Sequence, residues 1–323
     1  MRWMSLTSGL EDPTSPVRRF FQDRFPNLRL IKREVREQVV GRPTIRQSEA
    51  VPYGTVGTAI DYRISCYFPA ARPLLEDDWG TVADLGAGLV DEHLRAQSGA
   101  RVLVATGFLS QELANQFFLS LRGTLRELSP IARKLAKTDE ERLCRHCFTA
   151  ALFDEIVRYG GISRSLQESL IGALELEALL AQASKASIDD LCQMSWAFYD
   201  GQQDLLSAEA VLNPTFDGSR DVGGADADLI VDRCLVEVKT ALDPANIKKR
   251  SWPWQLLGYA LLDYSDTYAV EAVGLYLARQ ATLVRWPLDE YASKLAGRDV
   301  SLNEARRDLK VFLLETTNAP GSA

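Results

Sequence analysis

The sequence predicts a mixed α/β protein that is mainly helical in its N-terminal part. From about residue 83 to 207, apolar residues recur at three- and four-residue spacing, which is typical of packed amphipathic helices. From residue 208 the chain changes to short β-branched runs separated by Gly, Asp and Ser, which indicates strands. The length of 323 residues, 46% of them hydrophobic, suits about two average domains. We therefore expect a helical region over 1–189 and an α/β core over 190–323.

Residues 1–80 are the hardest part of the chain to assign. The segment PVRRFFQDRFPNLRLIKREVREQ interleaves arginine with phenylalanine, which fits either a solvated helix face or a nucleic-acid contact. We favour the helix face. The segment PYGTVGTAIDYRISCYF predicts a turn that leads into an amphipathic helix.

The next part of the chain predicts four helices. They are QELANQFFLSLRGTLREL, ARKLAKTDEERLCRHCFTAALFDEIVRY, SLQESLIGALELEALLAQA and IDDLCQMSWAFYDGQQDLL. The first ends at Ser129-Pro130 and the second at Gly160-Gly161, both strong helix stops. We interpret the whole of 1–189 as a region that regulates the core or binds a partner or substrate, with homo-oligomerisation through it left open.

The C-terminal part predicts short strands interrupted by a helical segment. AEAVLNPTF, ADLIVDR and CLVEVKTAL read as three strands, WQLLGYALLDY as a helix, and VEAVGLYLAR and TLVRWPL as two strands joined by a tight turn near Gln280. DEYASKLAGRDVSLNEARRDLKVFLLE is helical again, and TTNAPGSA is a frayed tail.

Composition excludes several classes of protein. Lys plus Arg is 37 and Asp plus Glu is 44, so the net charge of −7 excludes a strongly basic nucleic-acid-coating protein but not a locally basic channel. No apolar stretch approaches the roughly 20 residues of a membrane-spanning helix, and the first residues lack the features of a signal peptide. We therefore expect a cytoplasmic protein without a membrane partner. The chain also has no P-loop.

The five cysteines are scattered and odd in number, so they predict no secreted disulfide framework. Cys144 and Cys147 have the CxxC spacing of a zinc knuckle, with His146 between them, but no second tight pair exists. The alternative, which we favour, is that both are buried thiols one turn apart on a helix.

The stretch GGADADLIVDRCLVEVKT carries the residues best suited to chemistry. On a strand, side chains alternate between faces, so Glu237 and Lys239 share one face. Asp228 heads the preceding strand, and the short turn at Asp232-Arg233 predicts a hairpin that brings Asp228 near Glu237. Two carboxylates there would suit Mg²⁺, which binds one or two carboxylates and keeps several waters. The alternative is a surface Asp-Lys-Glu network on an ordinary hairpin.

Two further features strengthen the hypothesis of a reactive site. Gly223-Gly224 precede the acidic strand and permit the close approach of another chain segment. On the following helix, Gln255 and Tyr259 are four residues apart and so lie on one face. Gly258 lies between them and would let a backbone or substrate approach. The alternative is that Tyr259 is an ordinary core tyrosine.

These residues resemble the PD-(D/E)XK nuclease superfamily, specifically its RecB-like branch with a QxxxY motif. The resemblance rests on Asp228, on Glu237-x-Lys239 and on Gln255-x-x-x-Tyr259, and it covers about residues 190–290. It implies a restriction-endonuclease-like mixed sheet flanked by helices, and a Mg²⁺- or Mn²⁺-dependent nuclease that acts on nucleic acid, with DNA the favoured substrate. It also suggests a role in bacterial or antiviral defence, or in DNA repair.

The resemblance implies a role for each of these residues. Asp228 and Glu237 would bind the metal, with Asp226 as an alternative or auxiliary ligand. Lys239 would position or activate the attacking water. Gln255 and Tyr259 would lie beside the site and contact the substrate or support the ligands.

Relatives commonly add a His or Glu from an upstream helix, for which Asp190, Asp204 and Glu155 are candidates. The segment KKRSWPW could meet phosphates through Lys248, Lys249 and Arg250, and its tryptophans, Trp252 and Trp254, either stack on bases or anchor the core. The alternative functions are a non-catalytic nucleic-acid-binding or scaffold subunit and a ligand-sensing regulator.

Overall fold

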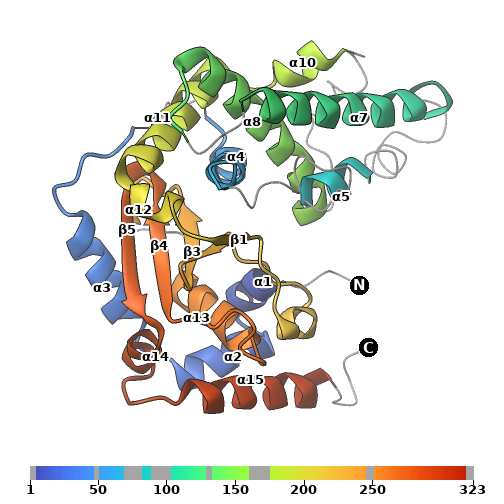
Figure 1. Cartoon of the computed structure of the whole chain (residues 1–323). Coiled ribbons are helices and arrows are strands. Elements are labelled where there is room, and N and C mark those ends of the chain that lie inside the picture. The colour runs from blue at the N-terminus through green and yellow to red at the C-terminus, as the bar shows by residue number, and fades with distance from the viewer. Residues whose placement is uncertain are drawn as a thin grey trace. The chain divides into compact units, whose positions relative to one another are not determined.

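The computed structural model describes residues 5–46, 51–68, 82–88, 103–128, 133–159, 175–244 and 251–317. Two compact units make up the chain (Figure 1). One joins residues 1–44 to residues 207–323, and the other comprises residues 45–206. No helix in the described ranges is long and apolar enough to cross a membrane.

Every described regular element of the unit 45–206 is a helix, as the sequence predicts. The helices are α4 (Tyr53–Ser65), α5 (Val82–Gly88), α7 (Leu103–Leu128), α8 (Lys137–Tyr159), α10 (Leu176–Leu180), α11 (Lys185–Gly201) and α12 (Gln203–Leu206). Helix α8 is central, because α4, α5, α7 and α11 all pack against it. Helices α7 and α8 end directly before the predicted stops at Ser129-Pro130 and Gly160-Gly161.

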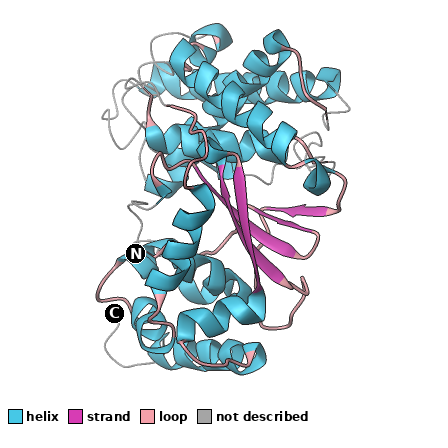
Figure 2. Ribbon diagram, turned by 90° about the vertical axis from the view of Figure 1, so that its left-hand side faces the viewer, coloured by secondary structure: helices cyan, strands magenta, loops and turns pink. Residues whose placement is uncertain are grey.

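The other unit contains one five-stranded mixed sheet, drawn in magenta in Figure 2. Its strands are β1 (Ala210–Leu212), β2 (Leu229–Val231), β3 (Cys234–Lys239), β4 (Ala272–Leu277) and β5 (Thr282–Pro287), in that spatial order. Strands β3 and β4 are parallel, and the other neighbours are antiparallel. Parallel neighbours need a crossover connection, which here contains the predicted helix α13 (Trp252–Leu262). The mixed α/β class predicted from the sequence is therefore confirmed.

The predicted hairpin at Asp232-Arg233 joins β2 to β3. Val231 pairs with Cys234, so only two residues form the turn. Both have positive φ angles, 48° at Asp232 and 56° at Arg233, as a type I′ turn requires. The turn fixes the register of the two strands and places Leu229 opposite Val236.

Helix α13 forms the centre of the core beneath the sheet. It packs against β3 and β4, and all eleven of its residues are buried. Leu235 of β3 and Val273, Leu275 and Leu277 of β4 belong to the same buried apolar cluster as α13. The face of β3 that carries Leu235 therefore looks toward α13. Glu237 and Lys239 alternate onto that same face.

The N-terminal residues belong to this unit rather than to the helical one. Helices α1 (Leu6–Glu11), α2 (Pro16–Arg24) and α3 (Leu28–Val39) contribute side chains to the core around α13. Helix α3 packs against α14 (Leu288–Ala296), and α2 packs against α15 (Leu302–Thr317). The division of the chain thus differs from the predicted boundary between 189 and 190, because the phenylalanines of the arginine-rich segment are core residues whose partners lie more than 200 residues away.

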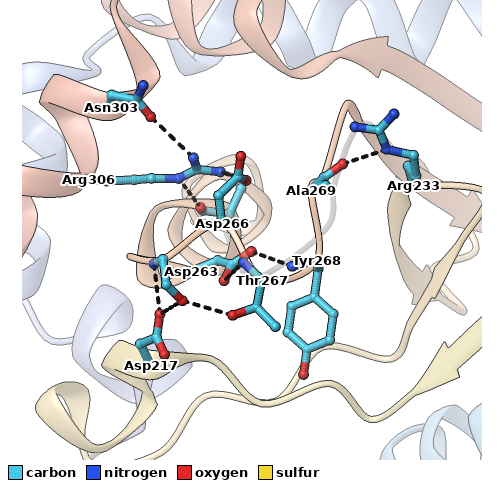
Figure 3. A network of polar contacts seen from close by, with 11 residues as sticks. Asp217, Arg233, Asp263, Asp266, Thr267, Tyr268, Ala269, Asn303 and Arg306 are labelled. Atoms are coloured by element: carbon cyan, nitrogen blue, oxygen red, sulfur yellow. Dashed lines mark hydrogen bonds and ion pairs between the residues drawn. The ribbon is translucent and has the colours of Figure 1, made fainter.

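The segment between α13 and β4 holds the end of α13 in place (Figure 3). The buried carboxylate of Asp263 accepts the N–H groups of Thr267 at 2.9 Å and Tyr268 at 3.1 Å. Arg306 of α15 donates to Asp266 at 2.7 Å and to the Ala260 carbonyl at 3.2 Å. These bonds anchor the helix that carries the QxxxY residues.

Candidate active site

The candidate site begins with Glu237 and Lys239 on β3, which lie side by side as predicted. The Lys239 ammonium donates to Glu237 Oε1 at 2.5 Å. The Glu237 side chain is only 5% exposed, whereas that of Lys239 is 20% exposed. The other oxygen, Glu237 Oε2, is buried and has no hydrogen-bond partner. A buried carboxylate oxygen in this state carries a desolvation cost that a bound cation would offset.

Asp228 lies next to this pair, one residue before β2. Continuing the register of β2 and β3 by one residue sets Asp228 opposite Glu237. Its carboxylate Oδ2 accepts the N–H of Val238 at 2.6 Å, and its carbonyl accepts the N–H of Asn213 at 3.1 Å. The hairpin therefore brings the two predicted carboxylates together, with Asp228 fixed at both its side chain and its backbone.

Asp226 lies two residues before Asp228 and forms an isolated bridge with Thr215. This bridge continues the register of β1 and β2, in which Leu212 pairs with Leu229. No group of three or more His, Cys, Asp or Glu side chains within the described ranges is arranged to hold a metal ion. Asp226 therefore stays a candidate for the auxiliary ligand, beside the pair formed by Asp228 and Glu237.

Gln255 and Tyr259 lie together on α13 and meet each other directly. The Gln255 amide donates to the Tyr259 hydroxyl at 2.8 Å. Both side chains are buried, and the Tyr259 ring stacks on Phe216 with centroids 5.7 Å apart. The ring of Tyr259 is thus part of the core, as the alternative predicts, while its hydroxyl is hydrogen-bonded to Gln255.

The Tyr259 hydroxyl is also close enough to the acidic residues to feel their charge. Burial raises the pKa of Tyr259 well above its ordinary value, and the charges of Glu237, Asp228 and Asp226 raise it further. Tyr259 is therefore neutral at physiological pH. Because its oxygen accepts a bond from Gln255, its proton remains to be donated toward an acceptor.

Helix α1 supplies a residue that the sequence alone does not indicate. Gln255 Nε2 donates to Thr7 Oγ1 at 3.1 Å, so Thr7 and Tyr259 together fix the amide of Gln255. Two glycines allow α1 to reach this position. The Leu6 N–H donates to the Gly224 carbonyl at 2.8 Å, where Gly224 has a φ of 131°. At Gly258 an added Cβ would lie 3.0 Å from the Leu6 side chain.

The predicted close approach at these glycines is therefore made by α1 of the same chain. Nothing in the sequence LTSGLED marks Thr7 as a partner of Gln255, which is 248 residues away. The local sequence indicates that a helix starts here, because the Ser5 side chain accepts the N–H of Ser8. It does not indicate which part of the chain this helix contacts.

Other sequence candidates lie outside this cluster. Asp190, Asp204 and Glu155 belong to the unit 45–206, and they remain candidates on sequence grounds alone. Lys248, Lys249 and Arg250 lie outside the described residues.

The tryptophans of the KKRSWPW segment are core anchors rather than base-stacking platforms. Trp252 and Trp254 are both buried. Trp254 donates to the Phe25 carbonyl at 2.7 Å and packs against Phe21. Neither ring is exposed to a ligand, because α1 to α3 cover this part of α13.

The cluster thus combines the buried carboxylate of Glu237, the half-buried carboxylate of Asp228, a lysine and a neutral tyrosine–glutamine pair. Such a set can bind a hard divalent cation and donate hydrogen bonds to an anionic substrate, but it offers no strong nucleophile of its own. Comparison of the chain with protein-family models, curated proteins and solved structures found no match.

Proposed function

We propose that this protein is a divalent-metal-dependent nuclease of the PD-(D/E)XK type that hydrolyses phosphodiester bonds in nucleic acid, most suitably DNA. The observation that carries the proposal is the buried Oε2 of Glu237, which has no hydrogen-bond partner and lies on a strand that also presents Lys239, beside Asp228. An apolar residue would be the stable choice at such a position unless the carboxylate served a ligand.

The order of elements supports the more specific fold assignment. The hairpin β2–β3 carries the acidic residues and the lysine, α13 carries Gln255 and Tyr259, and β4 returns parallel to β3. We propose on this basis that the sheet with α13 is a restriction-endonuclease-like core. It is completed by α1 to α3 from the start of the chain.

The residues present fit a magnesium ion held by two carboxylates. Asp228 and Glu237 would hold it, and the ion would polarise the scissile phosphate and stabilise the charge that develops on it. Lys239, held against Glu237 Oε1, would orient the attacking water. The neutral Tyr259 hydroxyl would donate a hydrogen bond to a ligand or phosphate oxygen, since Gln255 already occupies one of its lone pairs.

A cleavage assay tests the proposal directly. The full chain is incubated with supercoiled plasmid, linear duplex and single-stranded oligonucleotide in Mg²⁺, in Mn²⁺ and in excess EDTA. We expect cleavage with either metal and none with EDTA. Undiminished cleavage in EDTA would contradict the assignment, because these side chains provide no alternative nucleophile.

A second measurement separates catalysis from binding. If the chain binds the same oligonucleotides and Mn²⁺ but cleaves nothing, it is the non-catalytic nucleic-acid-binding subunit considered above. If it binds neither, the site has no role in nucleic-acid chemistry. A role in bacterial defence or DNA repair would follow from the nuclease activity and rests on it.

A further inference from the structure

Helix α3 has two faces of opposite character. Ile31 and Val35 lie on its inner face and are buried in the core around α13. Arg29, Arg33 and Arg36 lie on its outer face, and all three are exposed. Their spacing of four and then three residues sets them in one line along the helix. These three residues are called the arginine stripe of α3 below.

The two carboxylates of α3 do little to offset the charge of the stripe. Glu34 is engaged elsewhere, because its carboxylate accepts the Trp286 indole N–H at 2.8 Å and pairs with Lys294 at 3.0 Å. Glu37 lies 3.7 Å from Arg33, but both side chains are 66% exposed. A pair this open to water contributes little free energy and is easily exchanged for another anion. The stripe therefore keeps a positive charge that a partner can use.

The N-terminal part of the chain is basic, whereas the chain as a whole is acidic. Residues 1–44 contain nine Lys and Arg against five Asp and Glu, and the full chain contains 37 against 44. Eight of the nine cations in residues 1–44 are arginines. Arginine binds phosphate through parallel N–H groups of its planar guanidinium, which lysine cannot do. A net charge of −7 already favours solubility, so solubility does not require these arginines.

Helix α3 lies on the same face of the sheet as the candidate site. It packs beside β5 (Figure 1), where Glu34 binds Trp286. Trp286 of β5, Val273 of β4 and Leu235 of β3 are paired in one row across the sheet. Leu235 shares its face of β3 with Glu237. Two strand spacings, about 10 Å, separate β5 from β3, so one short length of nucleic acid is long enough to contact both regions.

The length of the stripe matches a phosphate backbone. From Arg29 to Arg36 the helix rises by about 10 Å, at about 1.5 Å per residue. One strand of duplex DNA carries a phosphate about every 3.4 Å along its axis, so the stripe spans about three successive phosphates. A lipid surface fits less well, because a helix on a membrane turns its apolar face toward the lipid. The apolar face of α3 is buried in the core instead.

We propose that the arginine stripe of α3 binds the phosphate backbone of the nucleic acid substrate and holds it beside the candidate site. This inference deepens the nuclease proposal and rests on it for the identity of the substrate. The stripe contacts phosphates rather than base edges. Its contribution to binding is therefore the same for every base sequence, and it weakens steeply as the salt concentration rises.

Binding of a labelled DNA duplex to the full chain tests this proposal. Fluorescence anisotropy in EDTA measures affinity without cleavage, over a range of salt concentrations. The variant combines Arg29→Gln, Arg33→Gln and Arg36→Gln, since glutamine keeps the helix propensity but removes the charge. We expect at least about tenfold weaker binding at moderate salt, and a slope of log affinity against log salt that is shallower by about two to three, near 0.9 for each lost phosphate contact. Two duplexes of unrelated sequence should give the same loss.

A second triple variant is the matched control. It replaces by glutamine three exposed lysines of the helical unit, each of which pairs with a carboxylate: Lys134, Lys137 and Lys185. The change in net charge is the same, but the control should bind the duplex like the wild type. Circular dichroism and thermal melts check that both variants are folded.

Cleavage with Mg²⁺ is measured on the same proteins, so that the two proposals fail separately. If the stripe variant binds as tightly as the wild type, or the control loses as much affinity, α3 is not the docking surface even where cleavage is intact. If the wild type binds through the stripe but cleaves nothing, the surface stands and the nuclease proposal fails. A wild type that binds vesicles of phosphatidylserine and phosphatidylcholine but no oligonucleotide would also overturn the inference.

Discussion

Glu237 keeps a buried carboxylate where an apolar side chain would cost less free energy. Of its two oxygens, Oε1 is paired with Lys239 and Oε2 has no hydrogen-bond partner. Leaving a buried polar atom unsatisfied costs about 1–3 kcal/mol. This cost favours the proposal that Glu237 binds a cation over a purely structural role.

Substitution of Glu237 tests this interpretation. We expect Glu237→Gln to lower the cleavage rate by at least about 100-fold, because it removes a metal ligand. Mg²⁺ should raise the unfolding temperature of the wild type but not that of the variant, since only the wild type gains binding free energy. Without metal the variant should be at least as stable as the wild type. Cleavage assays and thermal melts measure these effects.

Glu271→Gln is the matched control. Glu271 is exposed and pairs with Arg233 at 2.5 Å, away from the cluster. It should cleave and melt like the wild type. A Glu237→Gln protein with wild-type cleavage would show that β3 is structural.

His146 predicts a pH dependence of stability in the helical unit. Burial lowers the pKa of its imidazole below the ordinary value of 6.5, and the ring is held by Ser120 and the Arg142 carbonyl at 3.0 and 2.9 Å. The unfolded chain therefore binds a proton that the folded chain does not. Stability is complete above about pH 6.5 and falls as the pH decreases toward the lower, folded pKa.

We expect His146→Gln to remove this part of the pH dependence. Chemical denaturation at several pH values from 7.5 to 5.5 should show a smaller slope of unfolding free energy against pH in the variant, whatever its absolute stability. The pKa of Glu155 is raised chiefly by burial, so its titration changes the unfolding free energy with pH in the opposite direction to that of His146. This contribution is the same in the wild type and the variant, and it therefore cancels when their slopes are compared. Equal slopes would mean that His146 binds protons equally in the folded and the unfolded chain, which would contradict the lowered pKa.

At the level of elements, the hairpin was predictable because its signals are local. Two apolar runs flank Asp232-Arg233, and strand alternation sets Glu237 and Lys239 on one face. The conformation of the turn was less obvious, because arginine is a poor residue for the left-handed region that Arg233 occupies, with φ at 56°. Its guanidinium offsets part of that cost by donating to the Ala269 carbonyl at 2.9 Å.

Two substitutions at Arg233 isolate this backbone cost. Arg233→Gly and Arg233→Ala both lose the contacts of the guanidinium, but only glycine adopts a positive φ without strain. We expect the glycine variant to be more stable than the alanine variant by about 1 kcal/mol. Urea denaturation of both proteins measures the difference. Equal stabilities would mean that the turn relaxes to another conformation in the alanine variant.

Helix α1 shows the opposite case, an element whose role could not be predicted from local sequence. Its contacts with Gly224, Gly258 and Gln255 join positions more than 200 residues apart.

The contact of Thr7 with Gln255 can be tested by a conservative pair of variants. Thr7→Val keeps the shape but removes the hydroxyl that accepts the Gln255 amide, so we expect a loss of about 1 kcal/mol in stability and a several-fold lower cleavage rate. Thr7→Ser keeps the acceptor and should restore both toward wild type. If valine and serine variants cleave equally, Thr7 does not position Gln255 for the reaction.

At the scale of the whole molecule, the order of segments along the chain does not show which of them belong to the same compact unit. The change of texture at residue 208 correctly marks where the sheet begins, and one compact unit ends at Leu206. The other unit, however, also needs residues 1–44. Their apolar positions fit an ordinary amphipathic helix, and such a pattern indicates that a face is buried without saying against what.

Residues 1–44 contribute a large share of that unit's core. Eight of their side chains are buried in the cluster around α13: Leu6, Leu10, Val17, Phe20, Phe21, Phe25, Ile31 and Val35. At about 1.5–3 kcal/mol each, their burial is on the order of 12 kcal/mol or more, comparable with the about 5–15 kcal/mol total stability of a typical domain. The Trp286 indole adds a hydrogen bond to Glu34 at 2.8 Å.

We therefore predict that residues 207–323 do not fold without residues 1–44. Expressed alone, the 207–323 fragment should bind the dye ANS strongly and melt without a cooperative transition, because the face of α13 that α1 to α3 cover is exposed. Co-expressed with a 1–44 peptide, it should form a one-to-one complex that melts cooperatively and binds little dye. Size-exclusion chromatography, circular dichroism and dye fluorescence measure these outcomes. A 207–323 fragment that folds cooperatively by itself would contradict this prediction, because the core around α13 would then be complete without α1 to α3.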